Sequence, residues 1–215
     1  MTKPLVIIVG PTAVGKTNIS IQVAKKLNGE IISADSMQIY KYMDIGSAKP
    51  SVEEMEGIPH YLMDEIDPRE EFSVAQYQKL AKGYIDQIVA HKKLPILVGG
   101  TGLYVNAIIY DIDFTATVSN WNLRQQLEEE AKAFGNEHLH NKLCKVDPIA
   151  AARIHPNNVK RVIRALEVFE ESGEKIKDFQ EALIENPSYP YVMIGLIRDR
   201  EELYERINKR VDILI

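Results

Sequence analysis

The chain has 215 residues, of which 45% are hydrophobic and 27% charged, with a formal net charge of −5. This is the ordinary mix of a globular protein, and no internal repeat or low-complexity tract departs from it. No apolar run approaches the roughly 20 residues that span a bilayer, which excludes a membrane protein. Cys144 stands alone, which excludes an internal disulfide and a multi-cysteine metal site. We expect a cytoplasmic protein in which Cys144 is a buried thiol.

The first expected strand, 5–9, runs directly into the sequence GPTAVGKT. The pattern Gly10-x-x-x-x-Gly15-Lys16-Thr17 is that of a phosphate-binding loop, and it has a buried strand before it and an amphipathic helix after it. The glycines let the backbone approach phosphates, and the helix N-terminus favours negative charge. Lys16 would contact terminal phosphate oxygens, and the Thr17 hydroxyl would bind Mg²⁺. Alone, the loop predicts a nucleoside triphosphate and a transferred phosphoryl group.

The next elements alternate between helices and short apolar strands. A helix from Lys16 is expected to stop at Gly29, followed by a strand at 31–32. Ser73 is expected to cap a further helix, and 95–98 reads as a third buried strand. This alternation predicts a parallel sheet, whose ligands lie beyond the carboxyl ends of the strands. The phosphate-binding loop, Asp35 and Thr101 are all expected at that edge.

Asp35 is the acid of interest at this edge. A motor or switch nucleotide hydrolase normally has a strand that ends in an acidic metal ligand, but the strand 95–98 ends in two glycines. Asp35 follows the neighbouring strand instead. From spacing alone it could be a second-shell metal ligand, a general base or a helix cap.

The second half of the chain has a different texture. Residues 119–184 show helical stretches without a strand pattern, and Trp121 and Phe134 are expected in the core of that segment. A strand beginning near 191 and a helix from Arg200 then return to the first fold. We predict an α/β, P-loop NTPase-like parallel sheet core (1–114 plus 188–215) with a helical insertion (115–187). The last helix has no stop signal, so we expect the native chain to continue beyond residue 215.

Two arginines on the final helix are candidates for binding an anion. Arg206 has Glu202 one turn earlier, so a surface ion pair is an adequate alternative for it. Arg210 has Arg206 at that position, an unfavourable like-charge neighbour. An anion held between the two guanidinium groups would relieve this repulsion.

The segment 150–166 is basic and contains no acid, although the net charge of the whole chain is mildly against nucleic acid. Asn157 or Asn158 is expected to cap a helix here. Its cations occupy the first turns and its acids the later half, which opposes the helix dipole. A phosphate backbone at the helix start would reverse that penalty. The alternative is pairing within the helix, for instance of Arg164 with Glu167.

Six stretches together resemble the tRNA dimethylallyltransferases, also called tRNA isopentenyltransferases. They are GPTAVGKT at 10–17, ISADSMQIYKYMDIGSAKP at 32–50, GIPHYLMD at 57–64, LVGGTGLYVNAI at 97–108, VDPIAAARIHPNNVKRVIRALEVFEESG at 146–173 and LYERINKRVD at 203–212. The resemblance covers essentially the whole chain, and the second stretch is far more specific than the phosphate-binding loop. The chain departs from the family pattern at Tyr42, often Gly, and at Asn158, often Asp.

The resemblance implies transfer of a dimethylallyl group from dimethylallyl pyrophosphate to N6 of adenosine 37 in the tRNA anticodon loop, with release of pyrophosphate. It implies Asp35 as general base, with Arg210, Lys16 and Thr101 in the catalytic group and Mg²⁺ at Thr17. Thr12 and Thr101 would orient donor and base. Donor contacts would come from Gly10, Pro11, Thr12, Ala13, Val14, Gly15, Lys16, Thr17 and Arg206. Contacts to tRNA would come from Asp35, Ser36, Met37, Gln38, Arg124, Lys160, Arg161, Val162, Ile163 and Arg164.

We expect a monomer. Three other functions compete with the one that the resemblance implies. A small-molecule kinase would use ATP and transfer its γ-phosphate. A prenyltransferase acting on free adenine nucleotides would release pyrophosphate without needing the basic helix start. A non-catalytic nucleotide-binding module that gates a partner protein would keep its function when Asp35 is replaced.

Overall fold

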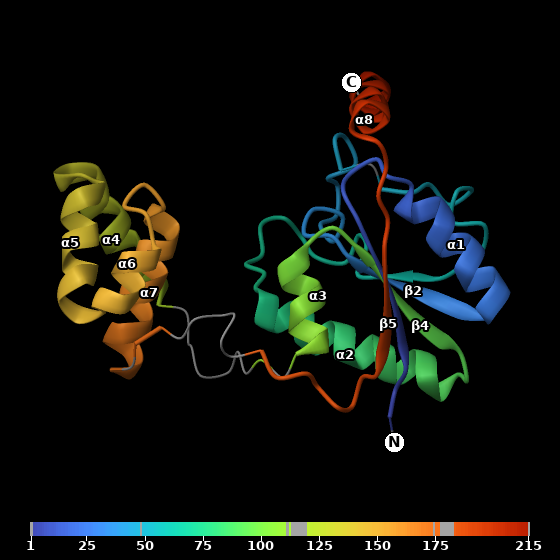
Figure 1. Ribbon diagram of the computed structural model, residues 1–215, viewed down its shortest axis with the longest axis horizontal. Helices are drawn as coiled ribbons and strands as arrows, with labels where there is room; N and C mark the ends of the chain where they lie inside the picture. The colour runs from blue at the N-terminus through green and yellow to red at the C-terminus, as the bar shows by residue number, and fades with distance from the viewer. Residues whose placement is uncertain are drawn as a thin grey trace. The chain divides into compact units, whose positions relative to one another are not determined.

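The computed structural model describes residues 2–47, 49–110, 112, 120–173, 175–176 and 183–214, with backbone alone for 213 and 214. The chain forms two compact units (Figure 1). Unit 1 comprises Met1–Asp111 and Ile184–Ile215, and unit 2 comprises Ile112–Leu183. In the described residues, no helix is both long and apolar enough to cross a membrane.

Unit 1 is built on a five-stranded, entirely parallel sheet with the strand order β3-β2-β4-β1-β5. The strands are β1 (Leu5–Val9), β2 (Gly29–Ala34), β3 (His60–Tyr61), β4 (Leu94–Gly99) and β5 (Tyr191–Gly195). The predicted α/β class with a parallel, P-loop-type core is therefore confirmed. The first and last strands, β1 and β5, lie side by side at one edge of the sheet.

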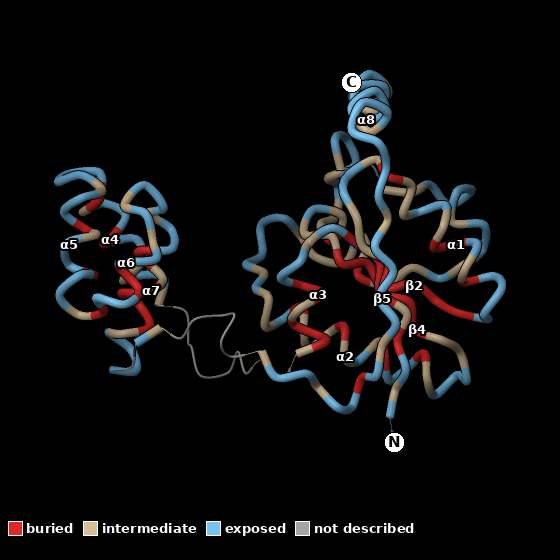
Figure 2. The backbone as a smooth tube through the Cα atoms, viewed as in Figure 1, coloured by how far each residue is buried: buried red, intermediate tan, exposed pale blue. Residues whose placement is uncertain are grey.

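Helices cover both faces of this sheet (Figures 1 and 2). The helix α1 (Lys16–Leu27) packs on one face, whereas α2 (Val74–Ala90) and α3 (Gly102–Ile109) pack on the other. Side chains alternate along β1, so that Ile8 joins the core under α1 and Ile7 joins the core under α2 and α3. The helix α8 (Arg200–Leu214) follows β5.

Local sequence signals place most of the helix ends in unit 1. Ser73 caps α2 as predicted, and it forms a reciprocal capping box with Gln76. The expected stop of α1 at Gly29 is wrong by one residue, because Asn28 takes the left-handed conformation there with φ of 50°. Gly29 instead begins β2, where an added Cβ would lie 2.8 Å from the carbonyl oxygen of Leu94.

Unit 2 is helical throughout its described part. It contains α4 (Trp121–Phe134), α5 (Asn136–Val146), α6 (Pro148–Arg153) and α7 (Val159–Ser172). Its core is formed mainly by leucines and alanines from all four helices, together with Val162 and Ile163 of α7. Three expectations of burial are wrong, since Trp121, Phe134 and Cys144 are exposed. On α4 the inward-facing stripe is carried by smaller residues such as Leu127 and Ala131.

Gly99 marks a tight approach between β4 and β2 at the edge of the sheet where ligands are expected. A Cβ added there would lie 2.1 Å from the carbonyl oxygen of Ala34. Gly83, on the exposed side of α2, has nothing within 4 Å of an added Cβ. The substitution of glycine by alanine can therefore be compared at a crowded position, Gly99, and at an open one, Gly83.

We predict that Gly99→Ala lowers the free energy of unfolding by about 1–3 kcal/mol, because backbone atoms of two paired strands must separate. Gly83→Ala should raise it by about 0.5–1 kcal/mol, because alanine favours a helix interior. Urea unfolding followed by circular dichroism measures both. A shift of the same sign in the two variants would contradict the packing described here.

Candidate functional site

The loop between β1 and α1 has the backbone of a phosphate cradle. Gly15 precedes α1 with φ of 108°, a left-handed conformation that L side chains rarely adopt. Ala13 also has a positive φ, of 64°. Val14 is buried, which anchors the loop to the fold. The backbone N–H groups at the start of α1 have no partners inside the helix, so this loop suits an anion.

Lys16 lies inside the cradle. Its ammonium donates hydrogen bonds to the carbonyl oxygens of Gly10 and Pro11, both at 2.9 Å. Burial lowers the pKa of Lys16, and the positive charge of Arg210 adds to this effect, whereas the negative charge of Asp35 opposes it. The three charged groups predicted for the site therefore act on one another in the folded chain.

Asp35 sits at the carboxyl end of β2 and caps the turn that follows it. Its Oδ1 accepts hydrogen bonds from the backbone N–H groups of Met37 at 2.9 Å and Gln38 at 3.3 Å. The Thr101 hydroxyl oxygen accepts from the N–H of Ser36 at 3.0 Å, which ties the same turn to the end of β4. Asp35 therefore caps a turn and not a helix, because residues 36–39 form a turn. It leaves Oδ2 available for a proton, since the described contacts of this carboxylate all use Oδ1.

Among the described residues, Asp35 does not belong to a group of side chains that could hold a metal ion by themselves. Within the described residues, no three His, Cys, Asp or Glu side chains group closely enough to hold a metal ion. Thr17 is the second residue of α1, directly after the loop. One hydroxyl with phosphate oxygens suits Mg²⁺, which keeps several waters and takes few protein ligands.

The arginines of α8 point to the loops around the cradle. Arg206 Nε donates to the carbonyl oxygen of Ala13 at 2.8 Å, and Arg210 Nη2 donates to the carbonyl oxygen of Ser47 at 3.4 Å. The alternative that paired Arg206 with Glu202 is wrong, because Glu202 pairs with Arg198 instead.

Arg198 was missed by the sequence analysis. Its Nε donates to the carbonyl oxygen of Val14 at 3.0 Å, so it holds the cradle from the side of β5. One signal could have found it: Arg198 comes shortly after a strand of a parallel sheet, at the edge where ligands bind. With Arg206 it brings a second guanidinium group to the phosphate-binding loop.

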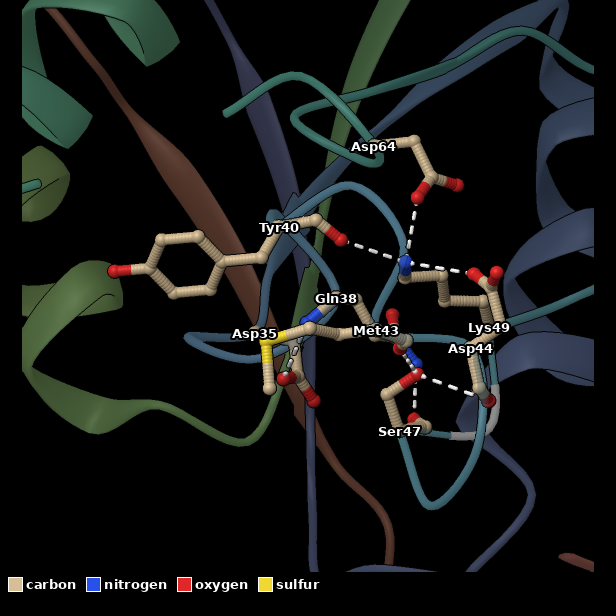
Figure 3. Close-up of polar contacts among 8 residues, drawn as sticks. All are labelled: Asp35, Gln38, Tyr40, Met43, Asp44, Ser47, Lys49 and Asp64. Atoms are coloured by element: carbon tan, nitrogen blue, oxygen red, sulfur yellow. Dashed lines mark hydrogen bonds and ion pairs between the residues drawn. The ribbon is translucent and has the colours of Figure 1, made fainter. Parts of the chain in front are cut away.

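A buried lysine organises the segment that follows Asp35 (Figure 3). The Lys49 side chain is 7% exposed, and its ammonium donates to the carbonyl oxygen of Tyr40 and to the carboxylates of Asp44 and Asp64. Burial alone would lower the pKa of Lys49, but the hydrogen bonds to Asp64 and Asp44 outweigh it and raise that pKa. Lys49 therefore stays charged and joins three parts of the chain.

The same segment connects Asp35 to α8. The carbonyl oxygen of Ser47 accepts hydrogen bonds from the Gln38 amide at 3.3 Å and from Arg210 at 3.4 Å. Gln38 lies in the turn that Asp35 caps. The position of Arg210 relative to Asp35 thus depends on the loop that Lys49 holds.

A small, open pocket lies beside Thr17 on the α1 side of the sheet, with Ser33, Gln38, His60 and Met63 among its lining residues. Burial lowers the pKa of His60, although the hydrogen bond from its Nδ1 to the carbonyl oxygen of Ile58 opposes this. His60 is therefore neutral at neutral pH. The sequence analysis gave no role to His60 or Met63, although both belong to the stretch GIPHYLMD.

In unit 2, the predicted nucleic-acid residues divide into three groups. Lys160 and Arg161 are exposed in the first turn of α7. The side chains of Val162 and Ile163 are buried in the core of the unit and do not lie on its surface. Arg124 and Arg164 both pair with Glu167, so the predicted alternative of pairing within the helix holds for Arg164.

Comparisons with known proteins agree on one family. A family model described as IPP transferase matches residues 38–215. The tRNA dimethylallyltransferase of Alkaliphilus oremlandii is 64% identical over 215 residues, which are 100% of this chain and 69% of that protein. The same enzyme of Acetivibrio thermocellus is 58% identical over 212 residues, 98% of this chain and 68% of that protein.

Solved structures show the same relationship. The full-length tRNA isopentenylpyrophosphate transferase of Bacillus halodurans matches with 51% identity and a TM-score of 0.66, over 99% of this chain and 66% of that one. A eukaryotic dimethylallyltransferase acting on tRNA matches with 32% identity and a TM-score of 0.83, over 99% of this chain and 53% of that one. The chain thus spans about two thirds or less of the length of these relatives.

We predict that Lys49→Met lowers the free energy of unfolding by about 1–3 kcal/mol, because a buried carbonyl and two carboxylates lose their donor. Lys25→Met removes a lysine whose ion pair with Glu56 is half exposed, and should cost less than about 1 kcal/mol. Since the pKa of Lys49 is raised, its contribution is complete below the usual lysine pKa and is lost only as the pH rises through the raised value. Urea titrations from about pH 7 to pH 9 should therefore give a constant difference. Equal losses in the two variants would contradict the role given to Lys49.

Proposed function

Because the chain belongs to the IPP transferase family of tRNA dimethylallyltransferases, we propose that it transfers a dimethylallyl group from dimethylallyl pyrophosphate to N6 of adenosine 37 in the tRNA anticodon loop. The observation that carries the proposal is the pairing of a phosphate cradle with Asp35. The charges of Lys16 and Asp35 act on each other, and the described residues contain no acidic metal cluster. The cradle thus has a carboxylate suited to proton transfer beside it.

The proposed reaction forms one bond and breaks another. The N6 nitrogen of adenosine attacks C1 of the dimethylallyl group, the bond from C1 to the pyrophosphate oxygen breaks, and the N6 proton passes to Asp35. The amine is a weak nucleophile because its lone pair is delocalised into the purine. A positioned carboxylate is worth about 10²–10⁴-fold in rate for such a step. Oδ2 of Asp35 would accept the proton, while Oδ1 holds the turn.

Pyrophosphate leaves with additional negative charge, and the cradle would stabilise that charge. Lys16 would exchange its bonds to the loop carbonyls for bonds to phosphate oxygens. Arg206 and Arg210 would add guanidinium groups, and Thr12 lies in the same loop. Such groups lower the barrier because they are already oriented when the charge develops. Mg²⁺ bound through the Thr17 hydroxyl and the phosphate oxygens would neutralise part of the same charge.

The tRNA would contact both units. In unit 1, Ser36, Met37 and Gln38 follow Asp35, and the Met37 side chain is exposed. In unit 2, Lys160, Arg161, Arg164 and Arg124 would contact the phosphate backbone. The target adenosine must leave the stack of the anticodon loop to reach the carboxylate. The substrate also favours a cytoplasmic location, and we propose a monomer.

The direct test is incubation with dimethylallyl pyrophosphate and unmodified tRNA, followed by mass analysis of the nucleosides. Adenosine with an added five-carbon group, together with free pyrophosphate, is the expected product. ATP in place of the donor should give no modified nucleoside. Transfer of a γ-phosphate to any acceptor would instead favour a kinase.

We predict that Asp35→Asn lowers the transfer rate at saturating substrates by about 10²–10⁴-fold, because the amide can hold the turn but cannot take a proton. Asparagine keeps the acceptor that Met37 and Gln38 need, so tRNA affinity should remain close to that of the unchanged chain. Asp67, which accepts from the Arg69 N–H in a similar turn, offers the control Asp67→Asn. Normal turnover in Asp35→Asn would refute the assignment of the base.

We predict that Lys160→Gln and Arg161→Gln together weaken tRNA binding and reduce the slope of log affinity against log salt by about 0.7–0.9 for each lost phosphate contact. Both side chains are exposed at the start of α7. Lys145→Gln, at an exposed position near the end of α5, should leave the slope unchanged. Filter binding at several salt concentrations measures the effect, and an unchanged slope in the double variant would remove this turn from the interface.

A further inference from the structure

Glu167 is a buried carboxylate in unit 2 to which the proposed reaction gives no role. Its side chain is 0% exposed, although it belongs to a helix whose first turns are basic. Oε1 accepts from the N–H of Asn120 and from Arg124 Nε, both at 2.8 Å. Oε2 accepts from Arg124 Nη2 at 2.9 Å and also from Arg164 Nη1.

These contacts keep Glu167 charged. Burial alone would raise its pKa, but the hydrogen bonds from Arg124, Arg164 and the Asn120 backbone outweigh it and lower that pKa. A buried charge persists only when its partners are well placed. Here four donors bond to the two oxygens, so the carboxylate is held in one position.

The two arginines are held in different ways by this one group. Arg124 makes a two-pronged contact, and its guanidinium also lies 4.7 Å from the centre of the Trp121 ring. Arg164 approaches from within α7, three residues before Glu167. The side chains remain 25% exposed for Arg124 and 33% exposed for Arg164, so solvent reaches both.

The cluster has a net positive charge, because two guanidinium groups share one carboxylate. Glu167 therefore has two opposite effects on a phosphate that approaches this surface. Its charge weakens the attraction, whereas its hydrogen bonds remove the freedom of two long side chains before the phosphate arrives. A free arginine side chain loses rotamer freedom when it binds a phosphate, and an arginine that is already held in place loses less. We expect the ordering of the arginines to outweigh the repulsion between the carboxylate and the phosphate, because the carboxylate stays buried while the arginines reach solvent.

We propose that Glu167 is a positioning residue, which holds Arg124 and Arg164 as a preformed pair for two phosphates of an RNA backbone. This inference rests on the proposed function, since it takes tRNA as the ligand of unit 2. Glu167 itself makes no contact with RNA in this proposal. Its effect on binding comes from the fixed orientation that it gives to the two arginine side chains. The partner class is a folded RNA with closely spaced phosphates.

Glu171 provides a matched control on the same helix. It is exposed, lies one turn after Glu167, and accepts a hydrogen bond from the Asn120 side chain at 2.6 Å. Glu171→Gln therefore removes the same charge and disturbs the same residue at the start of α4. In the described contacts, Glu171 bonds to no arginine.

The experiment measures binding of an unmodified anticodon stem-loop RNA to the whole chain by fluorescence anisotropy at several salt concentrations. Glu167→Gln should weaken binding about tenfold, the scale of one or two charge-assisted contacts, and should make the salt dependence shallower. Glu171→Gln should bind as the unchanged chain or slightly tighter. Binding of Glu167→Gln that equals or exceeds that of the unchanged chain would overturn the proposal, because neutralisation would then be the main effect.

A second variant covers the case in which Glu167→Gln does not fold, as judged by circular dichroism. Glu167→Asp keeps the charge but is one methylene shorter, so it cannot hold both arginines in place. Positioning predicts weaker binding in this variant, whereas an effect of charge alone predicts none, and unchanged binding in a folded Glu167→Asp would refute the proposal. If the unchanged chain itself fails to bind the RNA, the proposed function fails instead.

Discussion

The parallel pairing of β1 with both β4 and β5 is the constraint on which unit 1 depends. Val9 aligns with Gly99 of β4 and with Gly195 of β5, so three strands end at the same level. Each strand then delivers a part of the site at that edge: the phosphate cradle after β1, Thr101 after β4, and Arg198 after β5. Residues far apart in the chain meet there because parallel strands share one carboxyl edge.

Buried charge is the second organising feature, and the chain handles it in one consistent way. Lys16 is bonded to two carbonyl oxygens of its own loop, and Lys49 is bonded to a carbonyl oxygen and two carboxylates. In unit 2, the negative carboxylate of Glu167 is bonded to the guanidinium groups of Arg124 and Arg164. Because a buried charge is costly unless its partners are in place, each of these groups orders the segments around it. Polar groups in both units are therefore oriented before a ligand arrives.

Most elements of the core could be predicted from local pattern. The strand 5–9 and the cap at Ser73 both appear where short-range signals put them. One error arose where a local preference competed with a long-range contact. Glu202 and Arg206 are four residues apart in α8, but Glu202 forms its ion pair with Arg198. Arg206 instead donates a hydrogen bond to the carbonyl oxygen of Ala13. The contact between Arg206 and Ala13 joins residues 193 positions apart, so no short stretch of sequence contains both.

By itself, the sequence determined the chemistry that the chain can offer: a phosphate-binding loop before a helix, a carboxylate after a buried strand, and a basic helix start. These depend on residue type and short spacing, which the chain states directly. Only the tertiary structure decided which groups act together and which are withdrawn. Packing placed the side chains of Val162 and Ile163 in the core of unit 2, and it paired Arg124 with Glu167. The physical reason is that burial and charge pairing are properties of packed neighbours, and packing brings together residues that the chain keeps apart.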